Sequence, residues 1–486
     1  MLADRSWVEL VFRGSRIWGM IRGLLLGVLM AMGVPCATAQ DLAKGWVPDD
    51  EAKTNLVVIF CDDLGWGDLA SFGHPTIKTP RLDQMAAEGA RFTQFYSASP
   101  ACTASRYALL TGRVPKRSGF SWVLGPKSPR GIHPNEVTIA EGLKEQGYAT
   151  AIFGKWHLGR PEEYLPLAHG FDEYLGLPYS NDMRPPKWED IPLIEGNEVV
   201  ELNPDQRKLT RLYTDRAIEF IERHQEQNFF VYLPYAMPHL PLYPGENFAG
   251  SSARGTYGDV VEEIDHHVGR ILDRLTELGL ASNTLVVFTS DNGPWIIKDE
   301  EGGSSGLLRD GKGSTWEGGV RVPTVFWQPG AIEAGRVVRE VASTMDLLPT
   351  AFVNANQALP ESRALDGRSI ANLLYHPRLV EAYDEWESDG ILERKPLFFY
   401  GPSELHAVRS GPWKLHIRTS SQTGIKHFGG KLPLLFHLEH DPSEQWDLAE
   451  EHPEIVAELQ ALIDAHLAEV AATGNDFDPP AEASGD

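Results

Sequence analysis

One of the three cysteines in this 486-residue chain has neighbours suited to chemistry. Cys102 opens the run Cys-Thr-Ala-Ser-Arg, which follows Pro100 and leads into a short helix-forming stretch that stops at Gly112. This order predicts a helix N-terminus at Cys102, where free backbone N–H groups favour negative charge. Arg106 lies four residues on, so it shares the helical face of the cysteine and adds a permanent cation. The pattern indicates an activated thiol, and therefore a nucleophile site for an anionic substrate.

Two pairs of oxygen-bearing side chains follow predicted strands. Asp62 and Asp63 come directly after one apolar run, and Asp291 and Asn292 end another. A single pair of adjacent Asp residues is more often a solvated turn, but a second pair at another strand end weakens that interpretation. Four oxygen ligands from two strand ends predict a site for Ca²⁺, with Mg²⁺ as second choice. Zn²⁺ is disfavoured because no cluster of His and Cys has structural spacing.

Four further side chains lie in glycine- or proline-rich loops behind predicted strands. Lys155 and His157 are two residues apart in Gly-Lys-Trp-His-Leu-Gly, so on an extended segment both side chains point the same way. His239 is flanked by prolines, and Lys312 lies in the glycine-rich run 311–319. Each of these residues alone would more often be an ordinary packed or surface group. Their shared position after successive strands predicts one pocket that binds an anion.

Short β-branched runs alternate with helical patterns along most of the chain, which predicts an α/β fold. The strand candidates are residues 56–60, 150–153, 229–233, 285–289 and 324–327. Apolar residues at helical spacing from Val260 to Leu278 predict a helix that packs against the sheet. In open α/β sheets ligands collect at the carboxyl ends of the strands, where the side chains described above lie. We therefore predict a large mixed sheet sandwiched by helices.

The pattern changes near residue 395. Short runs at 397–400, 407–408, 413–417 and 434–438 predict a small antiparallel sheet, and residues 453–470 predict a final helix. The last residues are acidic and contain Gly and Pro, which is typical of disorder. The predicted organisation is a signal peptide at 1–39, a catalytic α/β domain at 40–395, a small C-terminal α+β subdomain at 396–470 and a disordered tail at 471–486.

Charge and the N-terminus bear on partners and location. A net charge of −24 argues against a nucleic-acid partner, so an anionic ligand needs a local group of cations. Four arginines precede an apolar run at 23–34 and a small-residue cleavage site, which predicts a signal peptide. The apolar run is shorter than the roughly 20 residues of a membrane span, which disfavours an uncleaved anchor. Few cysteines and no Asn-x-Ser/Thr site favour export to the bacterial periplasm or secretion over a glycosylated lysosomal protein.

These motifs together resemble the sulfatase family, in particular the arylsulfatase branch of the alkaline-phosphatase superfamily. The run 102–106 matches the pattern Cys-x-Pro/Ala-x-Arg, and Leu-Leu-Thr-Gly-Arg at 109–113 continues it. The likeness extends over residues 55–448, and the block 312–323 is similar to that of arylsulfatase A-like members. Ala104 stands where many members carry Pro, and the scarcity of cysteines differs from the animal enzymes.

The resemblance implies an alkaline-phosphatase-like fold and a modified nucleophile. In this family the cysteine that corresponds to Cys102 is oxidised during maturation by a formylglycine-generating enzyme, which leaves 3-oxoalanine (formylglycine). The hydrated aldehyde has two hydroxyl groups: one attacks sulfur, and the other, once deprotonated, collapses to the aldehyde and expels sulfate. A thiolate in its place would form a sulfur-linked ester with no internal route to release.

The resemblance also implies roles for the residues singled out above. Ca²⁺ would be held by one set of ligands, namely Asp62, Asp63, Asp291, Asn292 and the modified Cys102. Arg106 would orient the diol, and His157, with an ordinary pKa of roughly 6.5, would be the base of the elimination step. The sulfate ester would be bound by a second set, namely Lys155, Ser180, His239, Lys312 and, on a C-terminal loop, His427.

The leading hypothesis from the sequence is hydrolysis of a sulfate ester on a small aryl molecule or a glycan. The nearest alternative is a phosphonate monoester or phosphodiester hydrolase, because such enzymes use the same modified cysteine and a related metal site. A third interpretation is a non-catalytic protein that binds sulfated glycans. The complete set of nucleophile, cations and metal ligands argues against that third interpretation.

Overall fold

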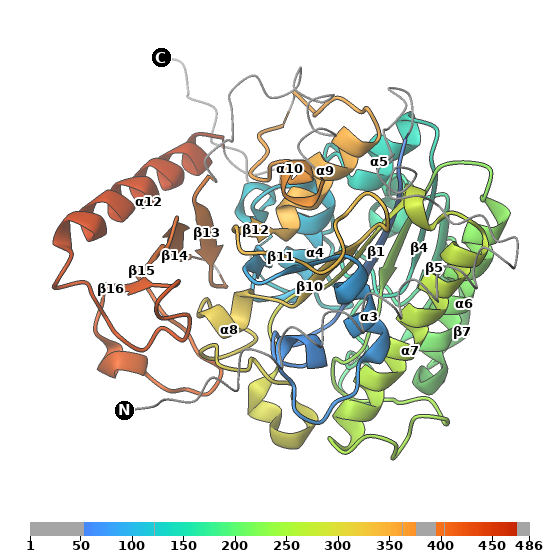
Figure 1. Cartoon of the computed structure of the whole chain (residues 1–486), viewed down its shortest axis with the longest axis horizontal. Coiled ribbons are helices and arrows are strands. Elements are labelled where there is room, and N and C mark those ends of the chain that lie inside the picture. The colour runs from blue at the N-terminus through green and yellow to red at the C-terminus, as the bar shows by residue number, and fades with distance from the viewer. Residues whose placement is uncertain (1–52, 121, 362, 376–394, 403, 474–486) are drawn as a thin grey trace, which may run out of the picture. The chain divides into compact units, whose positions relative to one another are not determined.

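The computed structural model describes residues 53–120, 122–361, 363–375, 395–402 and 404–473. These residues lie in one compact unit, Pro48–Asp486, built around a ten-stranded sheet (Figure 1). The strands of this sheet are β1 (Asn55–Cys61), β2 (Ala90–Phe92), β4 (Ala149–Phe153), β5 (Glu173–Gly176), β6 (Pro192–Glu195), β7 (Glu198–Leu202), β8 (Phe229–Pro234), β9 (Thr284–Ser290), β10 (Thr324–Trp327) and β11 (Arg336–Val338). A separate two-stranded sheet pairs β3 (Phe95–Tyr96) with β12 (Ala342–Ser343).

The strand order of the large sheet is β11-β2-β10-β9-β1-β8-β4-β5-β6-β7. The middle strands β9, β1, β8, β4 and β5 are parallel, while β10, β6 and β7 run antiparallel to their neighbours. β1 is paired on both sides and buried along its whole length, which accounts for its continuous apolar sequence. The prediction of a large mixed sheet is therefore confirmed.

The side chains of β1 alternate between the two faces of the sheet, and helices cover both of these faces. Val57, Ile59 and Cys61 belong to the main core cluster together with side chains of α3 (Pro80–Glu88), α6 (Leu209–Arg223) and α7 (Thr256–Glu277). On the other face, the guanidinium of Arg106, from α4 (Cys102–Thr111), lies over the ring of Phe60. Two further helices, α5 (Ile139–Glu145) and α9 (Leu347–Asn354), pack beside α4, and the short α10 (Ala371–Leu374) follows α9.

A second, smaller sheet forms the C-terminal part. Its four antiparallel strands are β13 (Leu397–Tyr400), β14 (Leu405–Ser410), β15 (Trp413–His416) and β16 (Leu434–His437). The helix α12 (Pro453–Thr473) packs against β14 and β15 (Figure 1). Trp316, just before the short helix α8 (Glu317–Val320), is buried against Leu434, Phe436 and Leu438. This apolar contact joins the small sheet to the glycine-rich run 311–319.

The predicted elements are present with small shifts of their ends. Each of the five strands predicted for the large sheet is found within one residue of its expected bounds, and the small sheet and final helix are confirmed. The short strands β2, β5, β6, β7 and β11 were not predicted; β7 lies at the sheet edge and is exposed along its length, so it lacks an alternating pattern. The described residues contain no helix long and apolar enough to cross a membrane. The predicted signal peptide, 1–39, lies outside the described residues. Of the predicted disordered tail, 471–486, the first three residues belong to α12, and the rest lies outside the described residues.

Candidate active site

The carboxyl ends of β1 and β9 bring the two acidic pairs together. The strands are parallel neighbours in which Cys61 is paired with Ser290, so the residues that follow each strand lie side by side. The backbone N–H of Asp63 donates to Asp291 Oδ1 over 3.1 Å. Asn292 Nδ2 lies 2.8 Å from Asp63 Oδ1. The sequence prediction that these strand ends meet is therefore supported by a direct hydrogen-bond network.

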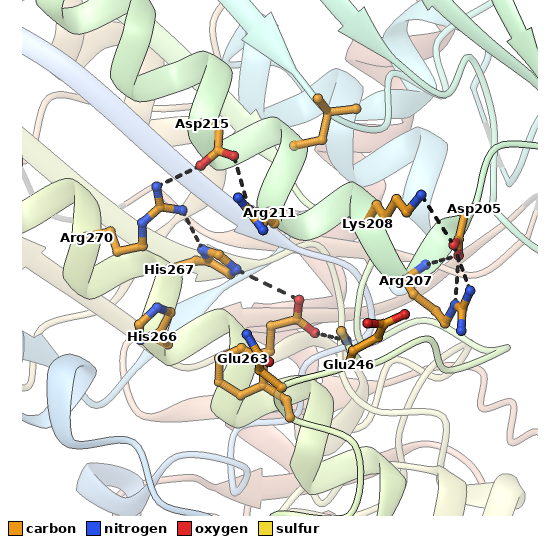
Figure 2. A pocket seen from close by; sticks show the side chains of 14 residues that line it. Asp205, Arg207, Lys208, Arg211, Asp215, Glu246, Glu263, His266, His267 and Arg270 are labelled. Atoms are coloured by element: carbon orange, nitrogen blue, oxygen red, sulfur yellow. Dashed lines mark hydrogen bonds and ion pairs between the residues drawn. The ribbon is translucent and has the colours of Figure 1, made fainter.

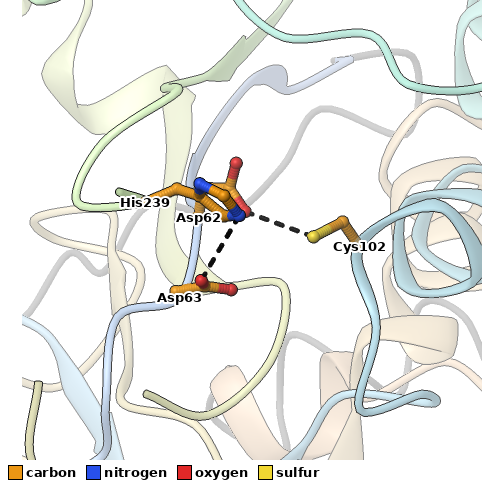
Figure 3. Close-up of side chains that lie close together, drawn as sticks. All are labelled: Asp62, Asp63, Cys102 and His239. Carbon is orange, nitrogen blue, oxygen red and sulfur yellow. Dashed lines mark hydrogen bonds and ion pairs between the residues drawn. The ribbon is translucent and has the colours of Figure 1, made fainter. Parts of the chain in front are cut away.

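Cys102 lies beside these acids at the N-terminus of α4. It is the first residue of the helix, it is 1% exposed, and its Sγ is 3.4 Å from Asp62 Oδ1. Figure 3 shows the thiol pointing toward the group formed by Asp62, Asp63 and His239. The predicted helix start at Cys102 is confirmed, and the helix ends at Gly112, which has the left-handed conformation expected of a C-terminal glycine.

Buried cations surround the acids. Lys155 Nζ is 2.5 Å from Asp62 Oδ2, and Lys312 Nζ is 2.7 Å from Asp63 Oδ2. Arg106 donates from one Nη to Asp291 Oδ2 over 2.9 Å and from the other to the carbonyl of Lys155. Three carboxylates are thus matched by three permanent cations in a volume from which water is largely excluded. A set balanced in this way has no surplus positive charge with which to attract an anion.

The electrostatics of the pocket keep Cys102 in its thiol form. Burial, and then the charge of Asp62, raise the pKa of Cys102 well above its usual value, and the nearby lysines do not overcome this. The activated thiol that the helix end suggested is therefore not supported by the structure. Burial also disfavours ionisation of Asp62, but Lys155, His239 and Arg106 hold its pKa well below the usual range. Burial and Asp62 raise the pKa of Asp291, despite the attraction of Arg106.

The donor set fits a hard divalent cation. Ligand atoms of Asp62, Asp63, Cys102 and His239 all lie within 4.8 Å of one another. Asn292 Oδ1 is buried and finds no hydrogen-bond donor among the described residues. Asp63 takes a left-handed φ of 67°, which costs a non-glycine residue on the order of 1 kcal/mol and turns its carboxylate toward this space. Carboxylate and amide oxygens in this number are the ligands that Ca²⁺ prefers.

His157 lies close enough to the cluster to feel the charges of Lys155, Arg106 and Asp62, and Ser180 is a second buried polar side chain predicted for the site. His157 has a left-handed φ of 60°, and its Nε2 is 2.9 Å from the carbonyl oxygen of Leu124. Burial, and then the charges of Lys155 and Arg106, lower the pKa of His157 well below its usual value, so the ring is neutral and is a weaker base than the ordinary histidine expected from the sequence. Ser180 Oγ is buried and has no hydrogen-bond partner among the described residues.

His427, which was predicted to bind the substrate from a C-terminal loop, contacts residues on either side of the start of the glycine-rich run. Its ring nitrogens are 2.9 Å from an Nη of Arg309 and 3.2 Å from Asp310 Oδ2, and it packs edge-on against Trp316. These contacts place it behind the glycine-rich run instead of against Asp62, Asp63 or Cys102. A loop position alone could not distinguish these two environments.

Two residues that the sequence did not single out contact the site. Trp295 lies beside His239, with ring centroids 5.4 Å apart, and Lys312 Nζ is 4.7 Å from the centre of its ring. Thr103 Oγ1 donates to the carbonyl of His157 over 2.9 Å and so joins α4 to the His157 loop. The only available signal was position, because Trp295 lies in the same loop after β9 as Asp291.

A cavity of about 600 Å³ lies elsewhere, between α6, α7 and the loop before α7 (Figure 2). Its lining includes none of the predicted site residues. The cations that face it are already paired: Arg270 Nη2 is 2.7 Å from Asp215, and Arg207 Nη2 is 2.8 Å from Asp205. With acids and cations matched in this way, the cavity has no surplus charge to attract an anion.

Two family models match the chain, one over the part with the large sheet and one over the part with the small sheet. The family model described as Sulfatase matches residues 54–356, and that described as C-terminal region of aryl-sulfatase matches residues 392–483. The chain is 41% identical to arylsulfatase A of Bos taurus over 449 residues, which cover 84% of this chain and 86% of that protein. It is 37% identical to N-acetylgalactosamine-6-sulfatase of Homo sapiens over 457 residues, which cover 85% of each.

Solved structures with a similar fold include enzymes of two named activities. The PsFucS1 sulfatase from Pseudoalteromonas sp. matches with a TM-score of 0.75 and 28% identity, over 86% of this chain and 90% of that one. The phosphonate monoester hydrolase of Agrobacterium radiobacter matches with a TM-score of 0.57 over 85% of this chain and 96% of that one. Its identity of 19% makes the second likeness one of fold alone.

Proposed function

The chain belongs to the sulfatase family of sulfuric-ester hydrolases, and from this premise we propose that it cleaves sulfate esters with a formylglycine made from Cys102 and a bound Ca²⁺. The observation that carries the proposal is the position of Cys102, 3.4 Å from Asp62 within a buried group of acids and cations. A thiol in these surroundings is a poor nucleophile, because burial and Asp62 raise its pKa. The same position suits an uncharged precursor that becomes reactive after modification.

The formylglycine and the Ca²⁺ would add the nucleophile and the positive charge that the unmodified chain lacks. The hydrate of formylglycine supplies two hydroxyls, one to attack sulfur and one to give up a proton when sulfate is released. The oxygens of Asp62, Asp63, Asp291 and Asn292 would hold Ca²⁺, which would supply the positive charge that the matched carboxylates and cations lack.

The residues of the chain then have separate tasks. Lys155 and Lys312 approach the acids from two sides and would hold the sulfate oxygens between them. His239 and Lys312, which lie against the same Trp295 ring, would stabilise the oxygen that leaves with the alcohol. His157, neutral and buried, would take the proton from the second hydroxyl. Arg106, fixed between Asp291 and the carbonyl of Lys155, would keep the diol in position.

The substrate class follows from the relatives and from the predicted location. Relatives named arylsulfatase A and N-acetylgalactosamine-6-sulfatase support an aryl sulfate or a sulfated carbohydrate as substrate. We propose an exported bacterial enzyme, with residues 1–39 as its signal peptide, residues 40–395 as its catalytic domain and residues 396–470 as its subdomain. Maturation would require a formylglycine-generating enzyme in the producing cell.

The test is to express the protein with a formylglycine-generating enzyme and to analyse the peptide that contains Cys102 by mass spectrometry. The same preparation is assayed with 4-nitrophenyl sulfate, bis(4-nitrophenyl) phosphate, a phosphonate monoester and a panel of sulfated glycans. We expect the aldehyde at Cys102 and turnover of sulfate esters above that of the phosphorus esters. The variant Cys102→Ala serves as control and should be inactive. A preparation that carries the aldehyde but prefers phosphorus esters would refute the sulfatase assignment.

A further inference from the structure

A buried ionic cluster joins the glycine-rich run to the small C-terminal sheet. Lys414 Nζ, from β15, is 2.8 Å from Glu317 Oε1 and 3.3 Å from Glu444 Oε1. His416 Nε2, also from β15, is 2.7 Å from Glu444 Oε1. All four of these side chains are fully buried. We refer to Glu317, Lys414, His416 and Glu444 as the junction cluster.

Glu444 does more in the junction cluster than pair with Lys414. Its Oε2 accepts a hydrogen bond of 2.7 Å from the backbone N–H of Glu317, the first residue of α8. Its own carbonyl accepts from Arg309 Nε over 3.1 Å. Its φ of 52° lies in the left-handed region, a conformation that costs roughly 1–2 kcal/mol for a residue other than glycine. The surrounding contacts therefore hold Glu444 in a geometry directed at the backbone of Glu317.

The segment that Glu444 holds is the one that carries Lys312. At its start, the N–H of Lys312 donates to Pro294 O over 2.9 Å, and the N–H of Gly313 donates to Pro100 O over 3.0 Å. These bonds tie the segment to the loop of Asn292 and to the residues before Cys102. At its end, Glu317 lies in the junction cluster and also contacts Tyr96 and Arg321, while the carbonyl of Gly319 accepts from the N–H of Gly293 over 2.9 Å. Lys312 is thus fixed from the active site on one side and from the C-terminal sheet on the other.

We propose that Glu444 and Lys414 are positioning residues that act on the sulfate ester through Lys312, so that the small C-terminal sheet is part of the active-site machinery. This role rests on the proposed function in so far as Lys312 binds the sulfate. The contrasting possibility is that the junction cluster only stabilises the fold. Replacing buried ionic groups can be neutral for stability, so stability alone does not separate the two roles.

A double-mutant cycle separates them, because two residues that act through one group give non-additive effects. Glu444→Gln, Lys312→Ala and the combined variant are prepared in the modified form, and kcat and KM are measured with 4-nitrophenyl sulfate. We expect Glu444→Gln to lower kcat about tenfold or more, since a small misplacement of a catalytic group can cost up to about 100-fold. In the Lys312→Ala background the same change should have no further effect on kcat. Equal effects in both backgrounds would overturn the proposal.

A control variant, a pair of substitutions at Lys414 and a direct measurement on Lys312 complete the experiment. Glu439→Gln, at an exposed position of the same C-terminal part, is the matched control and should leave kcat unchanged. Lys414→Arg retains the charge and should restore most of the activity that Lys414→Met loses; if Glu444→Gln does not fold, this pair of variants replaces it in the cycle. Competitive acetylation with acetic anhydride, followed by mass spectrometry, reports the mobility of Lys312 without any need for turnover.

We expect Glu444→Gln to raise the acetylation rate of Lys312 severalfold, while the rate of the exposed Lys431 is unchanged. An unchanged rate at Lys312 in a folded Glu444→Gln protein would overturn the proposal, whatever the activity. If the unsubstituted protein has no sulfatase activity, the proposed function fails, and the acetylation result still decides whether Glu444 positions Lys312.

Discussion

Lys414→Met tests the energetics of the junction cluster. Burial alone raises the pKa of Glu317, but Lys414 foremost, with Arg321 and Arg409, overcomes burial and brings that pKa to about 2, compared with 4.5 for an ordinary Glu. At about 1.36 kcal/mol for each pH unit, this difference corresponds to about 3 kcal/mol of stability at neutral pH. Breaking a buried ion pair by removing one partner costs about 3–5 kcal/mol in other proteins, which agrees in size. We therefore expect Lys414→Met to lower the free energy of unfolding by about 3 kcal/mol.

The stability lost in Lys414→Met should depend on pH, because the charge of Glu317 does. The pKa of Glu317 is lower in the folded protein than in the unfolded chain, so its contribution is present above about pH 4.5 and is lost as the pH falls toward about 2. In Lys414→Met the main charge that lowers the pKa of Glu317 is gone, so burial raises this pKa and the folded variant takes up a proton more easily. The difference in stability between the two proteins should therefore be largest near neutral pH and should narrow below about pH 4.5.

The assay is urea unfolding followed by tryptophan fluorescence, at about pH 7 and about pH 4, with linear extrapolation to zero denaturant. Lys431→Met is the matched control, because Lys431 is an exposed lysine near β16 that pairs with Asp447 and Glu450 at the surface. We expect this control to leave the free energy of unfolding nearly unchanged. A loss below about 1 kcal/mol for Lys414→Met, or a loss that is the same at both pH values, would refute the reasoning.

Two predictions concern the active site itself. Asp291→Ala removes a proposed metal ligand and the partner of Arg106, so we expect both the calcium content, measured by elemental analysis, and the turnover of 4-nitrophenyl sulfate to be lost; survival of both would show that the end of β9 does not hold the metal. Trp295→Ala removes the ring beside Lys312 Nζ, a cation–π contact of about 1 kcal/mol, so kcat/KM should fall about five- to tenfold in steady-state kinetics, whereas Trp295→Phe should retain most of it. Equal rates for Trp295→Ala and the unsubstituted protein would exclude a role for that ring.

The acidic half of the site was predictable from the sequence because parallel strands impose it. Once β1 and β9 are neighbours in register, Asp62 and Asp291 must lie together at the carboxyl edge. The same argument cannot place a residue on a long loop, since its position depends on tertiary contacts. The position of His427 is set by its contacts with Arg309 and Asp310, and that of Trp295 by its contact with His239. The sequence shows neither set of contacts.

The junction cluster was hidden from the sequence for a related reason. Glu317 and Glu444 are 127 residues apart in the chain, and although Glu317 lies in the block 312–323, Glu444 belongs to no motif that points to it. Charged residues in loops are mostly solvated, so their composition favours the surface. Only the packing of Trp316 against the small sheet shows that the whole segment after Lys312 is enclosed. The sequence therefore predicted the groups that we propose to bind the substrate better than the groups that hold them in place.

The burial of Cys102 limits when the proposed modification of its side chain could take place. Cys102 is 1% exposed, and every residue of α4 is buried, so an enzyme cannot reach the thiol or the flanking backbone in the folded protein. We expect modification to precede closure of the fold. A formylglycine-generating enzyme should convert a peptide of residues 98–113, while unmodified folded protein should remain unconverted by mass spectrometry over the same time. Conversion of the folded protein at the rate of the peptide would contradict this order and would mean that α4 opens locally at little cost in free energy.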